Sequence, residues 1–202
     1  MARIPAHARC VFHGVLFDVY QWEQELFDGS RATFEAVRRL PSVQILATTP
    51  DDRVVLLREE QPYVGTFVAV PGGRVDRGHT PEDTVLRELR EELGMVPEGV
   101  ELWNAETFGS TIEWTGYDFI ARRCRQVADP EQEPGERIEP YLVTFEQFLE
   151  EVERLDFRNK TLANRLFRMR HTPGALETFR ARLFGDGATG APRDRSLQET
   201  PP

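Results

Sequence analysis

Short apolar runs of strand length open the central part of the chain. Residues 43–47 and 53–57 are two such runs, and the turn-forming segment 50–52 separates them. Residues 67–70 form a third run, which ends at Pro71. Bounded runs of this length, rich in valine and leucine, are typical of buried strands, so the pattern predicts three strands of a sheet.

The pattern then changes to a helical period. Thr80 is a good N-cap, Pro81 suits the first helical position, and Gly94 ends the segment. Between them, apolar residues recur at helical spacing and would form one stripe: Val85, Leu86, Leu89 and Leu93. The sequence therefore predicts an amphipathic helix over residues 81–93.

Strands and helices continue through the rest of the chain. Strands are predicted near residues 100–110, 117–125 and 141–143, and an acidic loop with two prolines spans residues 126–136. Three helices are predicted to follow: residues 144–155, residues 160–170 with Asn159 as N-cap, and residues 175–184. This order predicts the α/β class, with a mixed β-sheet and helices on its faces.

An N-terminal β-hairpin precedes these elements. Leu16–Phe27 is rich in aromatic and β-branched residues, Asp28 and Gly29 form a strong turn pair, and Arg31–Arg39 returns. Pro41 then breaks the pattern. We therefore expect three parts: residues 1–41 as a hairpin appendage that contacts a second subunit, residues 42–184 as the main domain, and residues 185–202 as a disordered tail.

Composition limits the classes of protein to which the chain can belong. Its 202 residues, 40% hydrophobic and 29% charged, suit one soluble globular domain with an appendage. A net charge of −9 argues against a nucleic-acid backbone as partner, although a small phosphorylated ligand could bind through a metal ion. The chain has no apolar run of about 18 residues and no apolar signal-peptide core. With Cys10 and Cys124 as its only cysteines, we expect a cytoplasmic protein without a membrane span, a disulfide framework or a structural zinc site.

The polar side of the helix predicted at residues 81–93 gathers three acids. Glu88, Glu91 and Glu92 are neighbours, because residues three and four positions apart meet on a helix surface. Each like-charged pair costs about 0.2–0.5 kcal/mol, and a divalent cation would reverse the sign of this effect. Hard ions such as Mg²⁺ bind carboxylate oxygens and keep waters for a phosphate ligand. The other interpretation is a solvated acidic face with Arg87 and Arg90 as partners.

The spacing of these residues resembles a known signature. Gly73 followed by Arg87–Met95 resembles the Nudix box, which is a glycine, five residues, a glutamate, seven residues, and then Arg-Glu-aliphatic-x-Glu-Glu-x-Gly-aliphatic. Eight of its nine specified positions match. The resemblance implies the Nudix α/β/α sandwich and a pyrophosphohydrolase that cleaves a nucleoside diphosphate linked to another group.

The resemblance also implies roles for these residues. Mg²⁺, or Mn²⁺ in its place, would be held by four of them: Glu88, Glu91, Glu92 and Gly72. Arg87 and Glu88 would belong to the catalytic group, and the loop at Gly72 and Gly73 would bend closely around the metal. Two or more metal ions would neutralise the pyrophosphate and activate water. The local sequence suggests no Ser-His-Asp or Cys-His arrangement, so a covalent nucleophile is the weaker mechanism.

The N-terminal hairpin, the box and the acidic loop together look like the ADP-ribose pyrophosphatase branch of the family. In that branch the N-terminal strands help to form a homodimer, and a late-loop glutamate acts as base or metal ligand. Glu136 is the best positional match for the catalytic base, with Glu133 and Glu139 as alternatives, unless the loop is only a solvated acidic surface. Glu113, in another loop, is a weaker candidate. The expected substrate is ADP-ribose or a related nucleotide sugar.

The residues that bind the substrate are less well defined. Related enzymes often place an arginine after the second strand to meet the phosphates. The candidates here are Arg58 at the strand end and, from the hairpin, Arg38 and Arg39. Gly73, in the glycine loop, would approach the substrate with its backbone. Three aromatic residues could stack on a base or simply pack in the fold: Tyr20, Trp22 and Tyr63.

His79 stands where the box specifies its first glutamate. In the family that glutamate pairs with the box arginine, here Arg87, whereas a neutral histidine could only accept one hydrogen bond and a protonated one would repel Arg87. Three interpretations follow: a changed contact that reduces or retunes hydrolysis, a domain that binds nucleotides and hydrolyses them poorly, or a catalytic role for His79. Hydrolysis of another nucleoside polyphosphate is a further alternative.

Overall fold

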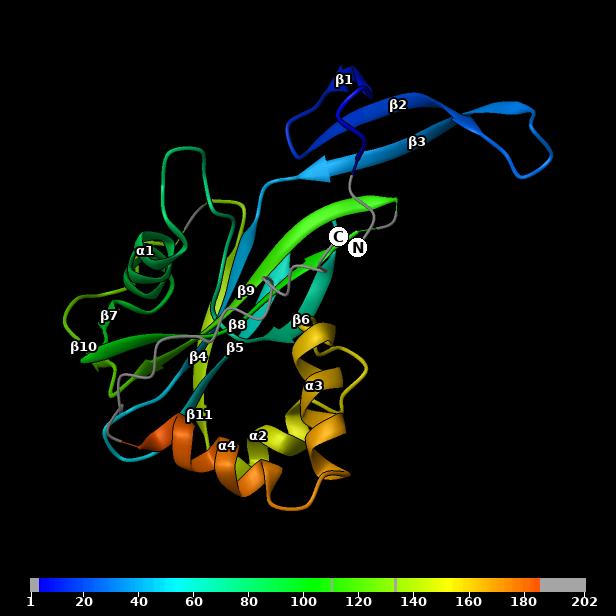
Figure 1. Cartoon of the computed structure of the whole chain (residues 1–202). Coiled ribbons are helices and arrows are strands. Elements are labelled where there is room, and N and C mark those ends of the chain that lie inside the picture. The colour runs from blue at the N-terminus through cyan, green and yellow to red at the C-terminus, as the bar shows by residue number, and fades with distance from the viewer. Residues whose placement is uncertain (1–3, 110, 133, 186–202) are drawn as a thin grey trace.

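A β-sheet core lies between one helix and a group of three helices (Figure 1). The computed structural model describes residues 4–109, 111–132 and 134–185. Helix α1 (Pro81–Leu93) packs in one hydrophobic cluster, and α2 (Phe145–Glu151), α3 (Lys160–Arg170) and α4 (Ala175–Phe184) pack in the other. The predicted α/β fold, with helices on both faces of a mixed sheet, is confirmed.

The described residues also form eleven strands. They are β1 (Arg9–His13), β2 (Phe17–Glu25), β3 (Arg31–Arg39), β4 (Ser42–Ala47), β5 (Val54–Gln61), β6 (Gly65–Ala69), β7 (Met95–Val96), β8 (Gly99–Phe108), β9 (Ile112–Arg122), β10 (Arg125–Gln126) and β11 (Arg137–Val143). No helix in these described segments is long and apolar enough to cross a membrane.

The central strands divide their side chains between the two helix layers, as a pleated strand requires. In β4, Ile45 joins the cluster on the α1 side, whereas the next residue, Leu46, joins the cluster with α2, α3 and α4. Phe119 and Ile120 of β9 divide in the same way. Because both faces of the sheet are buried, these strands consist of continuous apolar runs, and such runs are the pattern from which the sequence predicts them.

Strand pairing brings the glycine loop beside β4. In the largest sheet β9 runs parallel to β4 and antiparallel to β8, while β5 pairs with β6 and β11 in a second sheet. The chain that leaves β6 then follows β4, where the Ile45 N–H donates to the Pro71 carbonyl at 2.8 Å and the Val43 N–H to the Gly73 carbonyl at 2.9 Å. These bonds fix the loop that leads into α1.

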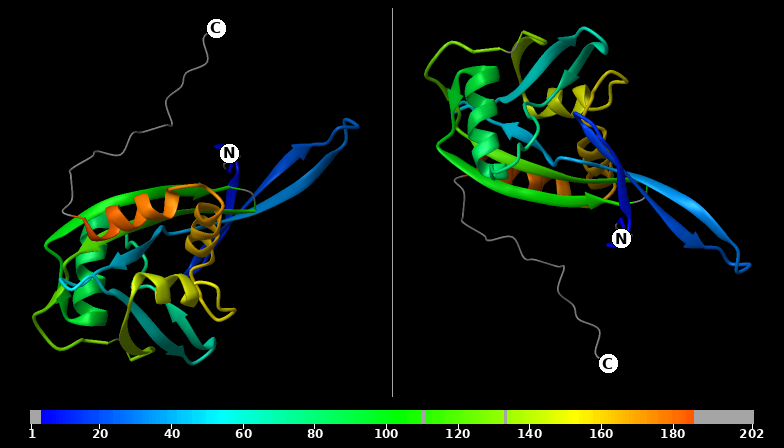
Figure 2. Two further views of the ribbon diagram at one scale, coloured as in Figure 1. Left: turned by 90° about the horizontal axis from the view of Figure 1, so that it is seen from below. Right: turned by 90° about the horizontal axis from the view of Figure 1, so that it is seen from above.

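The predicted N-terminal hairpin is present. β2 and β3 pair over their whole length and turn at Asp28 and Gly29, where Gly29 has a φ of +83° that favours glycine. β1, which the sequence does not predict, adds a third strand. These three strands, called the arm below, project from the body (Figure 1, Figure 2). β3 also pairs in parallel with β9 at Val37 and Arg38, so the arm continues the main sheet.

Two local predictions hold only in part. Asn159 is the N-cap residue of α3, as predicted, but its side chain makes no capping hydrogen bond, because its Oδ1 accepts from the Val70 N–H at 3.0 Å. α2 ends at Glu151, earlier than predicted, although its predicted capping box between Thr144 and Gln147 is present. The predicted disordered tail lies almost wholly outside the described residues, which end at Gly185.

Candidate functional site

Helix α1 begins and ends where the sequence predicts. The Thr80 side chain accepts from the Asp83 N–H at 3.1 Å, and Asp83 accepts in return from the Thr80 N–H at 3.2 Å. Gly94 ends the helix in the left-handed region, with φ at +63°. Val85, Leu89 and Leu93 are buried, as the predicted apolar stripe requires. Leu86, which the sequence predicts to belong to this stripe, is exposed instead.

The three glutamates of α1 are held by different partners. Glu88 and Glu92 are buried, and Glu91 is half-buried. Arg87 donates to Glu88 at 2.7 Å and to Glu91 at 2.6 Å, so it joins two of the three carboxylates. Glu92 accepts from the Gly72 N–H at 3.1 Å. The face is therefore a partly buried carboxylate cluster that lines a cavity, and Arg87 is its partner, as the alternative interpretation also expects.

Burial disfavours the charged forms of these acids. It raises the pKa of Glu88 to about 7, against the opposing charge of Arg87. Burial, followed by the charge of Glu88, raises the pKa of Glu92 well above its ordinary value. Carboxylates in this condition are stabilised by a cation that replaces the lost water, which suits a divalent metal ion.

The glycine loop leaves no room for a side chain. A Cβ added to Gly73 would lie 2.0 Å from Glu88 Oε1, and one added to Gly72 would lie 2.3 Å from the Val43 carbonyl oxygen. The backbone therefore approaches Glu88 as closely as glycine allows. This confines the carboxylate and places the backbone groups of the loop beside it.

The acidic loop after β10 is bonded to the end of α1. The N–H groups of Val127 and Glu131 donate to the carbonyls of Gly94 and Glu91, both at 2.8 Å. These bonds bring Glu136 to the same cavities as Glu92. Glu136 accepts from Gln61 Nε2 at 3.0 Å. The loop is thus a wall of the site rather than a free acidic surface.

Glu59 is an acid that sequence reasoning missed. It is 7% exposed, and Gln61 Nε2, which also binds Glu136, donates to it at 2.5 Å. Burial and then the charge of Glu136 raise its pKa. Side chains alternate between the two faces of a strand, so Arg58 and Glu59 of β5 must face opposite sides. This alternation could have identified Glu59 as a candidate residue of the site.

Two adjoining cavities form one cleft. Cavities of about 250 Å³ and about 450 Å³ share five lining residues: Gly72, Gly73, Arg74, Glu92 and Glu136. Glu88 and Glu91 line the smaller cavity, and Glu59 lines the larger. We call these five glutamates the acidic wall, namely Glu59, Glu88, Glu91, Glu92 and Glu136.

Three arginines also line the larger cavity. We call Arg39, Arg74 and Arg158 the basic wall. The Arg39 guanidinium lies over Trp114 at 5.1 Å and that of Arg158 over Phe67 at 4.5 Å. Burial lowers the pKa of Arg39, and the charges of Arg158 and Arg74 lower it further. Within the described segments no carboxylate pairs with Arg39, so an anion would relieve this repulsion.

The other predicted basic residues lie elsewhere. Arg58 faces Glu139 at 4.0 Å, and both line a neighbouring cavity, whereas neither lines the two cavities of the cleft. Arg38 pairs with Glu113 at 2.6 Å. Of the arginines predicted to bind the substrate, only Arg39 lines the cleft. Glu133 lies outside the described residues.

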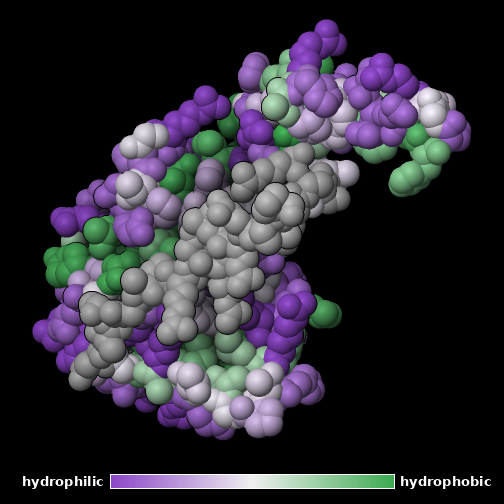
Figure 3. Space-filling view, in the orientation of Figure 1, coloured by the Kyte–Doolittle hydropathy of each residue, from purple (hydrophilic) through white to green (hydrophobic). Residues whose placement is uncertain are grey.

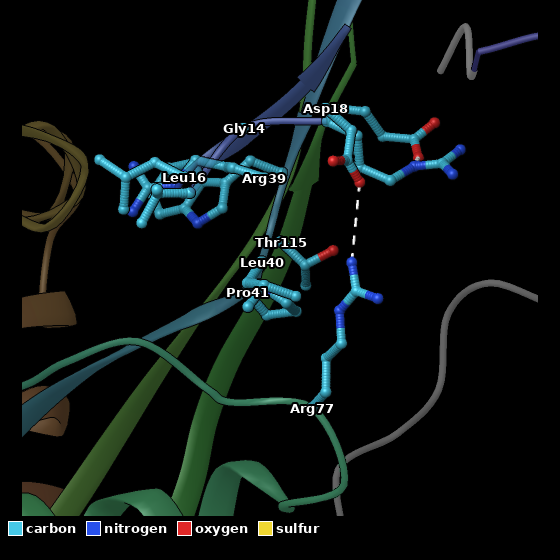
Figure 4. A pocket seen from close by; sticks show the side chains of 12 residues that line it. Gly14, Leu16, Asp18, Arg39, Leu40, Pro41, Arg77 and Thr115 are labelled. Atoms are coloured by element: carbon cyan, nitrogen blue, oxygen red, sulfur yellow. Dashed lines mark hydrogen bonds and ion pairs between the residues drawn. The ribbon is translucent and has the colours of Figure 1, made fainter. Parts of the chain in front are cut away.

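A further cavity of about 460 Å³ is lined by residues of the arm, of β9 and of the loop before α1 (Figure 4). Figure 4 shows Arg77 reaching toward Asp18, with a distance of 3.7 Å between their charged groups. Arg39 and Trp114 line this cavity as well as the cleft. The arm therefore helps to enclose space next to the basic wall.

His79 does not take the place of the missing glutamate. It is exposed, its N–H donates to the Asp76 carbonyl at 3.1 Å, and no bond joins its side chain to Arg87 in the described part of the chain. Burial opposes the charge of Arg87, whereas Glu88, Glu91 and Asp76 favour it and raise its pKa. Asp76, which binds Arg74 Nε at 3.0 Å, therefore supplies part of the expected support.

The carboxylates of the acidic wall are not arranged around a single position for a metal ion. Across residues 4–109, 111–132 and 134–185, no three acidic, histidine or cysteine side chains are arranged to hold one metal ion as they stand. The hydrogen bonds explain this spacing, because Arg87 holds Glu88 and Glu91 while Gly72 holds Glu92. A hard cation still fits the donor set, which is rich in carboxylate oxygen and lacks sulfur and imidazole.

Comparisons with known proteins agree with this architecture. A family model described as NUDIX domain matches residues 38–166. The chain is 34% identical to the ADP-ribose pyrophosphatase of Bacillus subtilis (strain 168) over 85 residues, which are 42% of this chain and 46% of the relative. It is 30% identical to the methanol dehydrogenase activator of Bacillus methanolicus over 92 residues, 45% of this chain and 50% of the relative.

Similarity to a solved structure extends further along the chain. A protein titled "Crystal structure of ADP compounds hydrolase" matches with a TM-score of 0.66 and 20% identity, over 82% of this chain and 91% of the other. At this identity the match supports the fold alone. The chain spans about half the length of the two Bacillus relatives that it matches.

Proposed function

Since this chain belongs to the NUDIX domain family, we propose that it is a Mg²⁺-dependent pyrophosphohydrolase that splits ADP-ribose or a related nucleoside diphosphate sugar. The observation that carries the proposal is the pairing of an acidic wall with a basic wall in one cleft. Metal ions on the first and arginines on the second suit a diphosphate linkage. The name of the Bacillus subtilis relative supports ADP-ribose as the first substrate to test.

The acidic wall would hold the metal ions through Glu88, Glu91 and Glu92, with Mn²⁺ as a substitute for Mg²⁺. Bound metal would polarise a phosphoryl oxygen and lower the pKa of a water molecule. Glu88 and Glu91 then have to exchange part of their contact with Arg87 for the metal. The released guanidinium would face the phosphate oxygens, which gives Arg87 a part in binding the reacting group.

Glu136 is the proposed base. It lines both cavities, and Gln61 orients its carboxylate by a hydrogen bond at 3.0 Å. Glu136 would take a proton from the attacking water as the new bond to phosphorus forms and the bridging P–O bond breaks. The products would be a nucleoside monophosphate and a sugar phosphate. Glu59 shares Gln61 with Glu136 and is the alternative base.

The basic wall would bind the phosphate oxygens that the metal ions leave free. Guanidinium groups bind phosphate through charge-assisted, often bidentate hydrogen bonds. Arg39 and Arg158 are held against Trp114 and Phe67, which fixes their position before the ligand arrives. Gly73 lines the cleft between the two walls and keeps the backbone open to the diphosphate.

We also propose that the protein is a cytoplasmic homodimer formed through the arm. Several of the arm's large apolar side chains are exposed, among them Phe12, Val15 and Phe27, and apolar patches show on the arm in Figure 3. The free cysteines Cys10 and Cys124 suit a reducing compartment. Light scattering on the full chain and on a variant without residues 1–40 tests the dimer, and a monomeric full-length protein would refute it.

The proposed activity is tested with a substrate panel in Mg²⁺ and in Mn²⁺. The panel contains ADP-ribose, nucleotide sugars, dinucleotides, dinucleoside polyphosphates and nucleoside triphosphates, each with wild type and Glu92→Gln. Fastest turnover of a nucleotide sugar supports the proposal, and preference for a triphosphate or dinucleoside polyphosphate would change the substrate class. No turnover above that of Glu92→Gln would favour a nucleotide-binding domain, the alternative that the exchange at His79 keeps open.

A further inference from the structure

The cleft extends past the glutamates to a wall that the proposed reaction does not use. This wall consists of Gln44 on β4 and the segment from Asn159 to Thr161, which follows Arg158 at the start of α3. The segment is fixed to β6, because the Arg158 N–H donates to the Val68 carbonyl at 2.7 Å and the Val70 N–H donates to Asn159 Oδ1 at 3.0 Å. It is therefore a rigid part of the cavity.

Gln44 has one end of its side-chain amide without a partner. The residue is 8% exposed, and Nε2 donates to Thr161 Oγ1 at 3.1 Å. Oε1 is buried and forms no hydrogen bond within the described segments. A buried carbonyl without a hydrogen bond destabilises the fold, and a leucine or methionine at this position of β4 would not carry this cost. The cost disappears when a ligand donates a hydrogen bond to Oε1.

A second unpaired group lines the same cavity. Trp114 Nε1 is buried without an acceptor among the described residues. The indole is stacked against Phe108, with ring centroids 4.9 Å apart, and Arg39 lies over its ring at 5.1 Å. These contacts occupy the aromatic surface that a nucleobase would need. Trp114 therefore offers its N–H rather than a stacking surface.

The free groups of this wall match hydroxyl groups. Gln44 Oε1 can accept, Trp114 Nε1 can donate, and the Thr161 hydroxyl, which accepts from Gln44, keeps its proton for donation. A sugar hydroxyl both donates and accepts, so neighbouring hydroxyls can satisfy this set together. Lys160 contributes little to ligand binding at this wall, because its ammonium already donates to the Arg154 and Leu155 carbonyls.

We infer that this end of the cleft is a subsite for a polyhydroxylated group attached to the diphosphate, and that Gln44 determines the specificity for it. The terminal torsion of a glutamine side chain is broad, so rotation about it would let Oε1 meet a ligand hydroxyl. The inference deepens the proposed function and rests on it for the position of the diphosphate. It identifies the sugar-bearing half of the substrate as the half that lies beside Gln44 and Thr161.

The test compares two probes that differ only in the hydroxylated group: ADP-ribose and the β-methyl ester of ADP. Gln44→Met keeps the side-chain length and removes the amide. We expect kcat/KM for ADP-ribose to fall about 10-fold and kcat/KM for the methyl ester to stay unchanged. Gln24→Leu, on the exposed arm, is the control and should change neither.

Thr161→Val provides a second test that is independent of the folding of Gln44→Met. It should lower the preference for ADP-ribose in the same direction by a smaller factor. Equal effects of Gln44→Met on both probes, or no effect on either, would overturn the subsite. If the wild type hydrolyses neither these probes nor any nucleotide sugar of the panel, the proposed function fails. Calorimetric dissociation constants for the two probes in Mg²⁺ then test the subsite separately, and a Gln44→Met protein with unchanged preference would overturn it.

Discussion

The two walls of the cleft are built in opposite ways. The acidic wall takes three of its five members from one turn of α1, between Glu88 and Glu92. The basic wall takes Arg39 from the end of β3, Arg74 from the loop after β6 and Arg158 from the segment before α3. The first depends on helix periodicity, whereas the second exists only once distant segments have packed.

The walls also differ in how their charges are compensated. Arg87 partly neutralises the acidic wall, and it would have to release Glu88 and Glu91 to a metal ion. In the basic wall, Arg158 lies 3.9 Å from Glu59, while Arg39 is stacked on an aromatic ring. The comparison teaches that a metal ion would complete the first wall, and that an anion would complete the second.

The largest expected effect is on the acidic wall. Glu92→Gln should lower kcat on ADP-ribose by on the order of 10³-fold, because it removes a proposed metal ligand from the transition state. Glu82→Gln, in the exposed first turn of the same helix, is the matched control and should stay within about twofold, as expected for a surface change. Steady-state kinetics in saturating Mg²⁺ measures both. Similar losses in the two variants would contradict the account.

The second expected effect concerns stability and pH. Burial raises the pKa of Glu88 to about 7 in the folded protein, above its value in the unfolded chain. The stabilising contribution of its protonated form is therefore complete at low pH and is lost as pH rises through about 7. We expect the metal-free free energy of unfolding to fall between pH 5 and pH 8 by roughly 2–3 kcal/mol.

Urea denaturation at several pH values, with and without Mg²⁺, measures this effect. Mg²⁺ should reduce the pH dependence, since bound metal favours the ionised carboxylates. The raised pKa of Glu92 acts in the same direction as that of Glu88. A metal-free protein that becomes more stable as pH rises over this range would contradict the interpretation of the acidic wall.

A smaller effect is expected on the basic wall. Arg39→Met should raise KM for ADP-ribose roughly 10-fold with little change in kcat, because a charge-assisted bond to phosphate is lost. Arg58→Met is the matched control, since Arg58 lines neither cavity of the cleft. Initial-rate measurements over a range of substrate concentrations distinguish the two. A larger effect at Arg58 would reverse the assignment of the arginines.

The smallest effect is expected at the residue that departs from the family signature. His79→Glu should change kcat by no more than about twofold, as for an exposed surface position. Asp76→Asn removes a charge that supports Arg87 and is expected to cost more. Steady-state kinetics of the two variants, measured side by side, tests this prediction. A large increase in kcat for His79→Glu would contradict it and would show that hydrolysis needs the glutamate that the family signature specifies at this position.

The parts that could be predicted from the sequence are those encoded locally. Thr80, Pro81 and Gly94 define α1 without help from the rest of the fold, and the positions of Glu88 and Glu92 follow from its period. The hairpin turn at Asp28 and Gly29 is local in the same sense.

The errors share a tertiary cause. Asn159 occupies the N-cap position of α3, but its side-chain oxygen accepts from the N–H of Val70, just after β6, and does not cap the helix. Arg58 looks like a phosphate ligand, but the pleat of β5 turns its neighbour Glu59 toward the cleft instead. Arg158 carries no local signal, because its position depends on the packing of its segment against β6.

The most direct test of the account is the hydrolysis of ADP-ribose as Mg²⁺ is titrated into metal-free protein, with the products identified. The account predicts saturable, Mg²⁺-dependent release of AMP and ribose 5-phosphate by the wild type, and a rate on the order of 10³-fold lower for Glu92→Gln. Hydrolysis that needs no divalent ion, or that proceeds equally in Glu92→Gln, would contradict it.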